Sequence, residues 1–178
     1  MTVKNKCLVT GAAGFIGSNL SYKLISDGIK TIGMDNLNEY YDPDLKRARI
    51  DRIQSHPSSD LFQFEVMDLR DKEDVMAIVE KTKPTVICHL AAQAGVRYSL
   101  EFPHSYVENN ISATINVLEA ARLNDVKDII LASTSSVYGL NTEMPFNEDL
   151  SIESTISTYS ASKRACELLC HTYHHLYG

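Results

Sequence analysis

Short apolar runs alternate with segments of helical periodicity along the chain, and this alternation limits the folds that it can adopt. The runs expected to form strands are residues 7–10, 31–34, 61–66, 85–88 and 128–132. Most of them are apolar throughout, as in strands buried on both faces. The run 61–66 instead alternates apolar and polar residues, which is typical of an edge strand.

Helical segments separate these strands, and apolar residues three or four positions apart lie on one helix face. Three such faces are predicted, made by Phe15, Ile16, Leu20 and Leu24; by Val75, Ile78 and Val79; and by Val107, Ile111, Thr114, Val117, Leu118 and Ala121. Strands joined by helices at this spacing connect through right-handed crossovers. We therefore expect the α/β class, with a doubly wound parallel sheet in the order 3-2-1-4-5.

Length and charge narrow the function classes. The 178 residues suit one domain over 1–178, with no second full domain. The net charge is −6, so we expect no nucleic-acid partner. Neither a signal peptide nor an apolar run of about 18 residues is present, which argues against a membrane span. One basic group is expected on the solvated face of a short helix: Lys46, Arg47, Arg49 and Arg52.

The cysteines and histidines suggest packing rather than metal binding. The four cysteines lie in apolar segments, so we expect free thiols and a reducing, cytoplasmic compartment. Cys166 and Cys170 share one helix face, whereas His171 and His174 fall on another. Four ligands could not converge on an ion without a second element, so no metal site is predicted.

The first chemical signal is a glycine-rich turn between a strand and a helix, Thr10-Gly11-Ala12-Ala13-Gly14-Phe15-Ile16-Gly17. Glycine permits a sharp turn and a close approach to a pyrophosphate, whose charge is met by N–H groups at the helix start. The spacing departs by one residue from the usual dinucleotide pattern. A glycine triplet alone is weak evidence, and a plain strand–helix turn is the alternative.

Asp35 strengthens the cofactor interpretation. It ends the second strand about 20 residues after the glycine turn, where a carboxylate can bind the adenosine ribose hydroxyls. A carboxylate there repels a 2′-phosphate, which favours NAD over NADP. The alternative is an aspartate that caps the next turn.

Tyr159 and Lys163 form the second chemical signal. Four residues apart, they lie on one helix face, where the lysine ammonium can lower the pKa of the tyrosine phenol. The spacing alone is weak evidence. Its weight comes from its place after the fifth strand, which ends in Ser133-Thr134-Ser135-Ser136, because ligands sit at the carboxyl ends of such strands.

Together these motifs resemble the extended short-chain dehydrogenases, the NAD-dependent epimerase/dehydratase family with a Rossmann-like fold. Val137-Tyr138-Gly139, Asp68-Leu69, His89-Leu90-Ala91-Ala92 and Asn109 also match the family's pattern. Residues 34–43 and 89–99 look like the UDP-glucuronate 4-epimerase subfamily. The resemblance covers nearly the whole chain.

The resemblance implies specific roles. It makes Tyr159 the general base, Lys163 its electrostatic partner and holder of the nicotinamide ribose, and Thr134 a hydrogen-bond donor to the reacting oxygen. The implied NAD-binding residues are Gly11, Gly14, Phe15, Ile16, Gly17, Asp35, Asn36, Asp68, Leu69, Leu90, Ala91, Ala92, Asn109, Ser133, Tyr159 and Lys163. The UDP-sugar substrate is expected to contact Arg97, Thr134 and Ser135. For Arg97, a role as a surface arginine is an equal alternative.

Ser135 and Ser136 favour a 4-epimerase. Related dehydratases carry an acid at or beside this place, because elimination needs a proton shuttle. A dehydratase or dehydrogenase of the same family remains the alternative, as does a non-catalytic NAD-binding or subunit-pairing module.

The family's C-terminal substrate lobe is absent from this sequence. We therefore expect the isolated chain to be inactive and the strand at 128–132 to have one unpaired side. Apolar residues on the last helix, Leu168, Leu169, Tyr173 and Leu176, would be partly exposed. A homodimer through 107–121 and the Tyr159 helix is the expected assembly.

Overall fold

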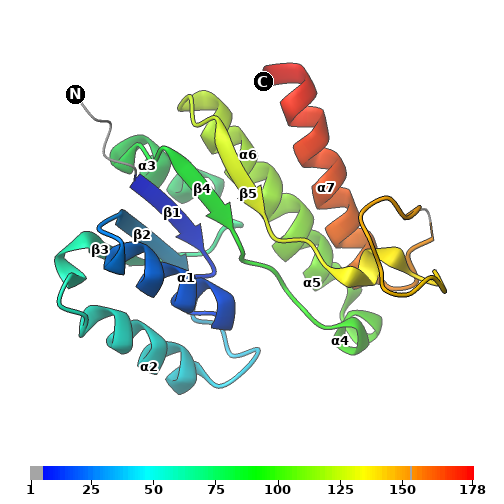
Figure 1. The fold of residues 1–178 in the computed structure, drawn as a ribbon, viewed down its shortest axis with the longest axis horizontal. Helices are drawn as coiled ribbons and strands as arrows, with labels where there is room; N and C mark the ends of the chain where they lie inside the picture. Colours follow the sequence, from blue (N-terminus) through cyan, green and yellow to red (C-terminus); the bar gives the residue numbers. More distant parts are fainter. Residues whose placement is uncertain (1–5, 153) are drawn as a thin grey trace.

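Parallel strands form the centre of the molecule. The computed structural model describes residues 6–152 and 154–178. Within them a five-stranded sheet has the order β3-β2-β1-β4-β5 (Figure 1). The strands are β1 (Lys6–Thr10), β2 (Lys30–Asp35), β3 (Phe62–Val66), β4 (Val86–His89) and β5 (Asp128–Leu131). The predicted class and strand order are confirmed.

Helices cover both faces of this sheet (Figure 1). On one face α3 and α6 pack against β1, β2 and β4; on the other lies α1, with α2 beside it near β3. The α-helices are α1 (Phe15–Ser26), α2 (Pro43–Gln54), α3 (Lys72–Thr82), α4 (Val96–Glu101), α5 (Pro103–Tyr106), α6 (Ala113–Leu123) and α7 (Thr158–Tyr177). Shorter turns are η1 (Ser59–Leu61), the π-helical η2 (Val107–Ser112) and η3 (Ser135–Tyr138).

The strand register brings the carboxyl ends of the strands to one edge of the sheet. Thr10 of β1 pairs with Met34 of β2 and with His89 of β4. His89 in turn pairs with Leu131 of β5. Because all strands are parallel, the turns that follow them are clustered at this edge, which is where ligands bind in such sheets.

The two outer strands, β3 and β5, each pair on one side only within the described residues. β3 is an edge strand, as its alternating sequence predicted. At the other edge, β5 pairs with β4 alone within the described residues, and Ile130 is 58% exposed. The expectation that this strand has one unpaired side agrees with the described sheet.

The predicted face of α1 was partly wrong. Leu20 and Leu24 pack toward the sheet, but Phe15 and Ile16 are 71% and 64% exposed. The helix instead buries mostly small residues, Gly17, Ser18, Ser21 and Ile25. The first turn approaches the preceding loop so closely that a Cβ on Gly17 would lie 2.1 Å from the Gly11 carbonyl oxygen. Large side chains at the start of α1 must therefore point away from the core.

The helical segment after α5 also differs from a single regular helix. The residues Thr114, Val117, Leu118 and Ala121 are buried as predicted. Ahead of them, however, the π-helical η2 adds a residue to the turn and rotates the face. As a result Asn110 is buried, whereas Val107 is 46% exposed and Ile111 is only partly covered.

All four cysteines are free thiols, as expected, and Cys7, Cys88 and Cys166 are buried. Among the helices of residues 6–152 and 154–178, none combines the length and the apolar character that crossing a membrane requires.

Candidate functional site

A cavity of about 330 Å³ opens at the carboxyl edge of the sheet. Its walls come from the ends of β1, β2, β3 and β4, from the start of α1 and from η2. Most of the predicted cofactor-binding residues line it: Gly11, Gly14, Phe15, Ile16, Gly17, Asp35, Asn36, Asp68, Leu69, Leu90, Ala91, Ala92 and Asn109. Residues separated by up to about a hundred positions thus face one space, although the ligand of each remains a prediction.

The glycine turn has the geometry of an anion site. Gly11 has φ +69°, and a Cβ there would lie 2.9 Å from the Ala91 backbone nitrogen. No side chain caps the start of α1, and its first turn carries no acidic residue. The N–H groups and the helix dipole at this end favour negative charge, so the turn fits a phosphate group.

Asp35 accepts hydrogen bonds from nearby backbone N–H groups and also lines the cavity. Its carboxylate accepts hydrogen bonds from the backbone nitrogens of Leu37 (2.9 Å) and Ala13 (3.2 Å). Asp35 therefore does cap the turn that follows β2, as the alternative interpretation predicted. Because Asp35 also lines the cavity, capping and ligand binding are compatible in the same residue.

Lys46 does not lie on a solvated helix face, and that prediction was wrong. It is 4% exposed and lines the cavity. Its ammonium donates to the Asn38 carbonyl (2.9 Å) and side-chain oxygen (2.8 Å), and lies 3.9 Å from the Asp35 carboxylate. Burial lowers the pKa of Lys46. The spacing of Lys46 with Ile50 and Ile53 on one helix face was the available signal, because both isoleucines are buried.

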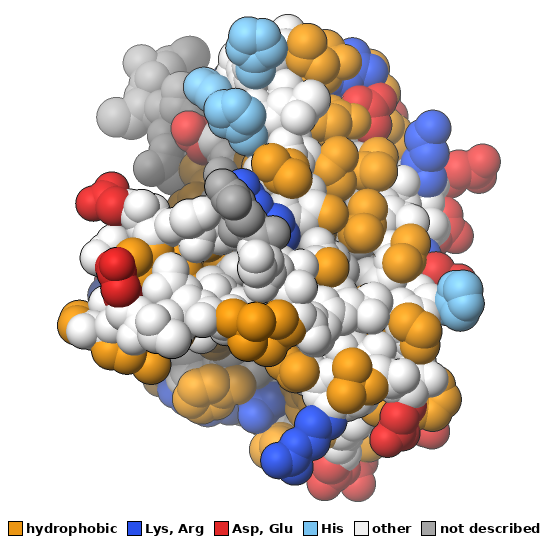
Figure 2. Space-filling model, turned by 90° about the vertical axis from the view of Figure 1, so that its right-hand side faces the viewer, with side chains coloured by type: hydrophobic (Ala, Val, Ile, Leu, Met, Phe, Trp, Pro, Cys, Tyr) orange, Lys and Arg blue, Asp and Glu red, His pale blue; other side chains and the backbone are white. Residues whose placement is uncertain are grey.

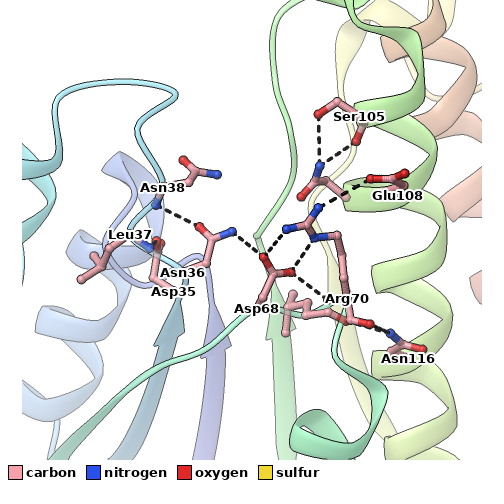
Figure 3. Close-up of polar contacts among 11 residues, drawn as sticks. Asp35, Asn36, Leu37, Asn38, Asp68, Arg70, Ser105, Glu108 and Asn116 are labelled. Carbon is pink, nitrogen blue, oxygen red and sulfur yellow. Dashed lines mark hydrogen bonds and ion pairs between the residues drawn. The ribbon is translucent and has the colours of Figure 1, made fainter.

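Asp68 belongs to a polar network that joins three elements (Figure 3). Asn36, after β2, donates to its carboxylate at 3.1 Å, and the Arg70 guanidinium makes two hydrogen bonds of 3.0 and 2.9 Å. Arg70 also reaches Glu108 of η2 at 3.5 Å. Burial raises the pKa of Asp68, but the hydrogen bonds from Arg70 and Asn36 outweigh it and lower the pKa to about 2. The carboxylate is therefore held ionised as an acceptor.

Further cavity residues were missed by sequence reasoning: Met34, Asn38, Tyr40, Tyr41, Lys46, Met67, Gln93 and Ala113. Gln93 is the most informative. Its side chain is 7% exposed, and its amide nitrogen has no hydrogen-bond partner within the described part of the chain. That nitrogen has almost no accessible surface, so Gln93 lines the cavity with its other atoms.

Other predicted residues do not line this cavity. Tyr159 and Lys163 lie in the first turns of α7, which begins at a capping box formed by Ser157 and Ser160. Lys163 is 4% exposed, and burial lowers its pKa. The Tyr159 ring packs against Tyr106 with ring centres 5.9 Å apart.

The strand-end residues occupy the neighbouring turn. Thr134 caps η3 by accepting from the Ser136 nitrogen at 3.2 Å, and η3 packs against α7. Ser133 donates to Glu167, and Ser135 is exposed. Arg97 is exposed on α4. The catalytic and substrate roles of these residues stay predictions.

The cysteine and histidine cluster is divided between environments. The thiol of Cys166 contacts Thr114 and the Asn110 carbonyl in the interior. His171 and His174 instead line a groove of about 350 Å³ beside β5. Across the described ranges, no group of three or more His, Cys, Asp or Glu has an arrangement suited to a metal ion.

Comparison with known proteins identifies similar sequences and folds. The model of the GDP-mannose 4,6-dehydratase family matches residues 8–178. A UDP-glucuronate 4-epimerase of Thermodesulfobacterium geofontis is 44% identical over 171 residues, covering 96% of this chain and 52% of the relative. UDP-glucuronate 4-epimerase 4 of Arabidopsis thaliana is 46% identical over 172 residues, covering 96% and 38%. The chain thus spans about half the length, or less, of these relatives.

A solved structure supports the same relationship. The crystal structure of the Bacillus cereus UDP-glucuronic acid 4-epimerase, in complex with UDP-glucuronic acid and NAD, superposes with a TM-score of 0.84 at 36% identity. The match covers 97% of this chain and 53% of that one.

Removing the guanidinium beside Asp68 should change how the fold responds to acid. Because the folded-state pKa of Asp68 is about 2 against an ordinary 3.8, its stabilisation is present above about pH 4 and is lost as pH falls through about 2. In Arg70→Gln we expect the Asp68 carboxyl to titrate at a higher pH, measured by ¹³C NMR. Arg47→Gln, at an exposed surface pair with Asp44, is the control. Equal Asp68 midpoints in wild type and Arg70→Gln would contradict this.

Proposed function

The chain belongs to the GDP-mannose 4,6-dehydratase family of NAD-dependent epimerases and dehydratases, and we propose that it is the NAD-binding portion of a UDP-sugar 4-epimerase. The proposed reaction interconverts UDP-glucuronate and UDP-galacturonate. The observation that carries the proposal is that the glycine turn and Asp35 line the same cavity. The relatives named UDP-glucuronate 4-epimerase support the choice of sugar.

The cavity residues fit the parts of NAD in turn. The uncapped start of α1 and the glycine turn suit the pyrophosphate. Asp35 suits the adenosine ribose hydroxyls. Asp68 and Leu69 line the cavity where the adenine is expected, although each Asp68 carboxylate oxygen already accepts two hydrogen bonds from the groups of Asn36 and Arg70. The cavity thus offers backbone donors for the phosphates and a carboxylate acceptor for the ribose hydroxyls.

The proposed chemistry assigns the proton to the α7 residues. Tyr159 takes the proton of the sugar 4-hydroxyl, and Thr134 donates a hydrogen bond to the same oxygen. The buried ammonium of Lys163 stabilises the tyrosinate. NAD, held by the glycine turn and Asp35, would supply reversible hydride acceptance at C4. Tyr159 then gives the proton back, so no second redox substrate is consumed.

Ser135 and Ser136 support epimerisation over dehydration, because neither side chain can act as the acid that elimination requires. A non-catalytic NAD-binding module is the second candidate. It is favoured by one observation: the lining of the cavity includes no side chain of Thr134, Tyr159 or Lys163.

We also propose that two copies pair through η2, α6 and α7. Hydrophobic side chains form a band on the side of the molecule that carries α7 (Figure 2). Large apolar residues more than a third exposed on these elements are Val107, Ile115, Leu123, Leu168, Leu176 and Tyr177. An exposed apolar band of this kind is typical of an association surface.

Asp35→Asn should relax the choice between cofactors. We expect the wild-type chain to bind NAD at least about tenfold more tightly than NADP, and the variant to bind them within about threefold, because the 2′-phosphate no longer meets a carboxylate. The asparagine keeps an acceptor for Leu37. Isothermal titration measures both affinities, with Asp44→Asn at the exposed surface as control. Comparable affinities in the wild type would overturn the Asp35 assignment.

Turnover should require more than this chain. We expect the 178 residues to bind NAD without useful epimerisation, because sugar positioning supplies as much as roughly 7–11 kcal/mol of barrier reduction. In a chimera extended with the second half of the Thermodesulfobacterium relative, Tyr159→Phe should abolish formation of UDP-galacturonate while NAD binding is retained. Tyr173→Phe on the same helix is the control. Full activity of the Tyr159→Phe chimera would refute the catalytic assignment.

Association should depend on the apolar band. Leu168 is 50% exposed on α7, so Leu168→Glu places a charge on the proposed interface without entering the core. Sedimentation velocity at micromolar concentration should show a dimer for the wild type and a monomer for the variant. Leu100→Glu on α4, also exposed, is the matched control and should remain dimeric. A monomeric wild type would exclude this interface.

A further inference from the structure

A buried hydrogen-bonded chain lies behind the cavity, between the glycine turn and α7. It begins at Thr10, the last residue of β1, and passes through His89 at the end of β4 and Thr114 of α6. These side chains are 0%, 2% and 2% exposed. None of the three belongs to the proposed catalytic group or to the cavity lining, so their contacts need a separate explanation.

The donor direction at Thr10 follows from its backbone partners. Its hydroxyl oxygen accepts from the backbone nitrogens of Leu90 and Ala91, each at 3.1 Å. These bonds use both lone pairs of the hydroxyl. The Thr10 hydrogen is therefore left for the Nδ1 of His89, which lies 2.8 Å away.

The tautomer of the His89 ring follows from this donor direction. Because Nδ1 accepts, the ring carries its hydrogen on Nε2, which donates to the Thr114 hydroxyl at 3.0 Å. Burial, and secondly the charge of Lys163, lower the pKa of His89 to about 3. His89 is thus neutral at physiological pH, and its two nitrogens have opposite roles.

The chain then continues into α7. The Thr114 hydroxyl donates to the Cys166 thiol at 3.3 Å, and the thiol donates to the Asn110 carbonyl at 3.4 Å. The Asn110 amide donates to the Ser162 hydroxyl at 2.8 Å, and Ser162 donates to the carbonyl of Tyr159, also at 2.8 Å.

The π-helical turn η2 makes this continuation possible. It rotates Asn110 into the interior, where its side chain also holds the Gln93 backbone through bonds of 2.7 and 3.1 Å. One amide therefore contacts both the turn after β4, which lines the cavity, and the first turns of α7. Such turns are frequent at functional sites.

We propose that His89 is a positioning residue, held as the neutral Nε2–H tautomer, that fixes the Tyr159 turn of α7 relative to the glycine turn. The inference rests on the proposed function, in which α7 carries the proton-transfer group and the glycine turn carries the cofactor. From Thr10 to the Asn110 carbonyl, the donor direction of each group agrees with that tautomer. The Asn110 side chain, held by the Gln93 backbone, then links this part of the interior to Ser162 and the Tyr159 carbonyl.

The tautomer itself is measurable without ligand. Long-range ¹H–¹⁵N NMR spectra of the chain with ¹⁵N-labelled histidine separate the six imidazoles. The His89 signals are those lost in His89→Gln. We expect an unprotonated Nδ1 and a protonated Nε2, unchanged between roughly pH 5.5 and 8, where an ordinary histidine titrates. A protonated Nδ1, tautomer averaging or titration in this range would overturn the proposal.

Variants at Thr114 test the positioning role. Thr114→Val removes the hydroxyl but keeps the shape, whereas Thr114→Ser keeps the hydroxyl. We expect Thr114→Val to keep the His89 tautomer, because Thr10 still donates to Nδ1, but to accelerate amide hydrogen exchange at 159–163 and to weaken NAD binding by about three- to tenfold. Thr114→Ser should retain wild-type behaviour in all three. Thr172→Val, which makes the same substitution at an exposed position of α7, is the control.

The outcomes separate the two proposals. If the wild-type chain does not bind NAD, the proposed function fails, while the tautomer and exchange measurements still decide the role of His89. Unchanged exchange at 159–163 in a folded Thr114→Val variant would refute the positioning role. If Thr114→Val does not fold, the wild-type tautomer decides it, and a protonated Nδ1 refutes the role.

Discussion

The close approach of the β1–α1 turn to the backbone after β4 is the constraint on which the site depends. Gly11 leaves room for this approach, since a Cβ there would lie 2.9 Å from the Ala91 nitrogen. Gly17 lets α1 start close to the same turn, since a Cβ there would lie 2.1 Å from the Gly11 carbonyl oxygen. The approach brings the uncapped start of α1 beside Ala91 and forms one wall of the cavity. The same edge receives the ends of β2 and β3, because the strands are parallel and in register. A cofactor site at this edge therefore follows from the sheet topology once the glycine turn is in place.

Fixed charges around the cavity are compensated rather than isolated. Lys46 stands near Asp35, and Arg70 holds Asp68 ionised. Burial of each charge alone would be costly, so these pairs keep the carboxylates ionised at the cavity wall. The buried chain through His89 has the complementary property, since it is neutral and its hydrogen bonds have a definite direction.

Sequence reasoning failed where a helix departed from regular geometry or where polar residues were buried. Helical periodicity predicts that Phe15 and Ile16 face the sheet, because it carries no information about the close backbone contact between Gly17 and Gly11. Asn110 was passed over because the π-helical turn adds a residue, which no spacing rule anticipates. The sequence predicts a solvated Lys46, because a lysine is rarely buried without a partner and its partners Asn38 and Asp35 come together only through the loop after β2.

The sequence by itself determined the α/β class, the strand order and the glycine turn with Asp35. Those features depend on local periodicity, on chain chirality and on the spacing of short motifs, all of which are written along the chain. Only the tertiary structure decided that Gln93 and Lys46 face the cavity and that Thr10 is linked to the Tyr159 turn through His89. Those arrangements depend on which side chains are buried and on hydrogen bonds between segments far apart in sequence. Both are established only when the segments pack together.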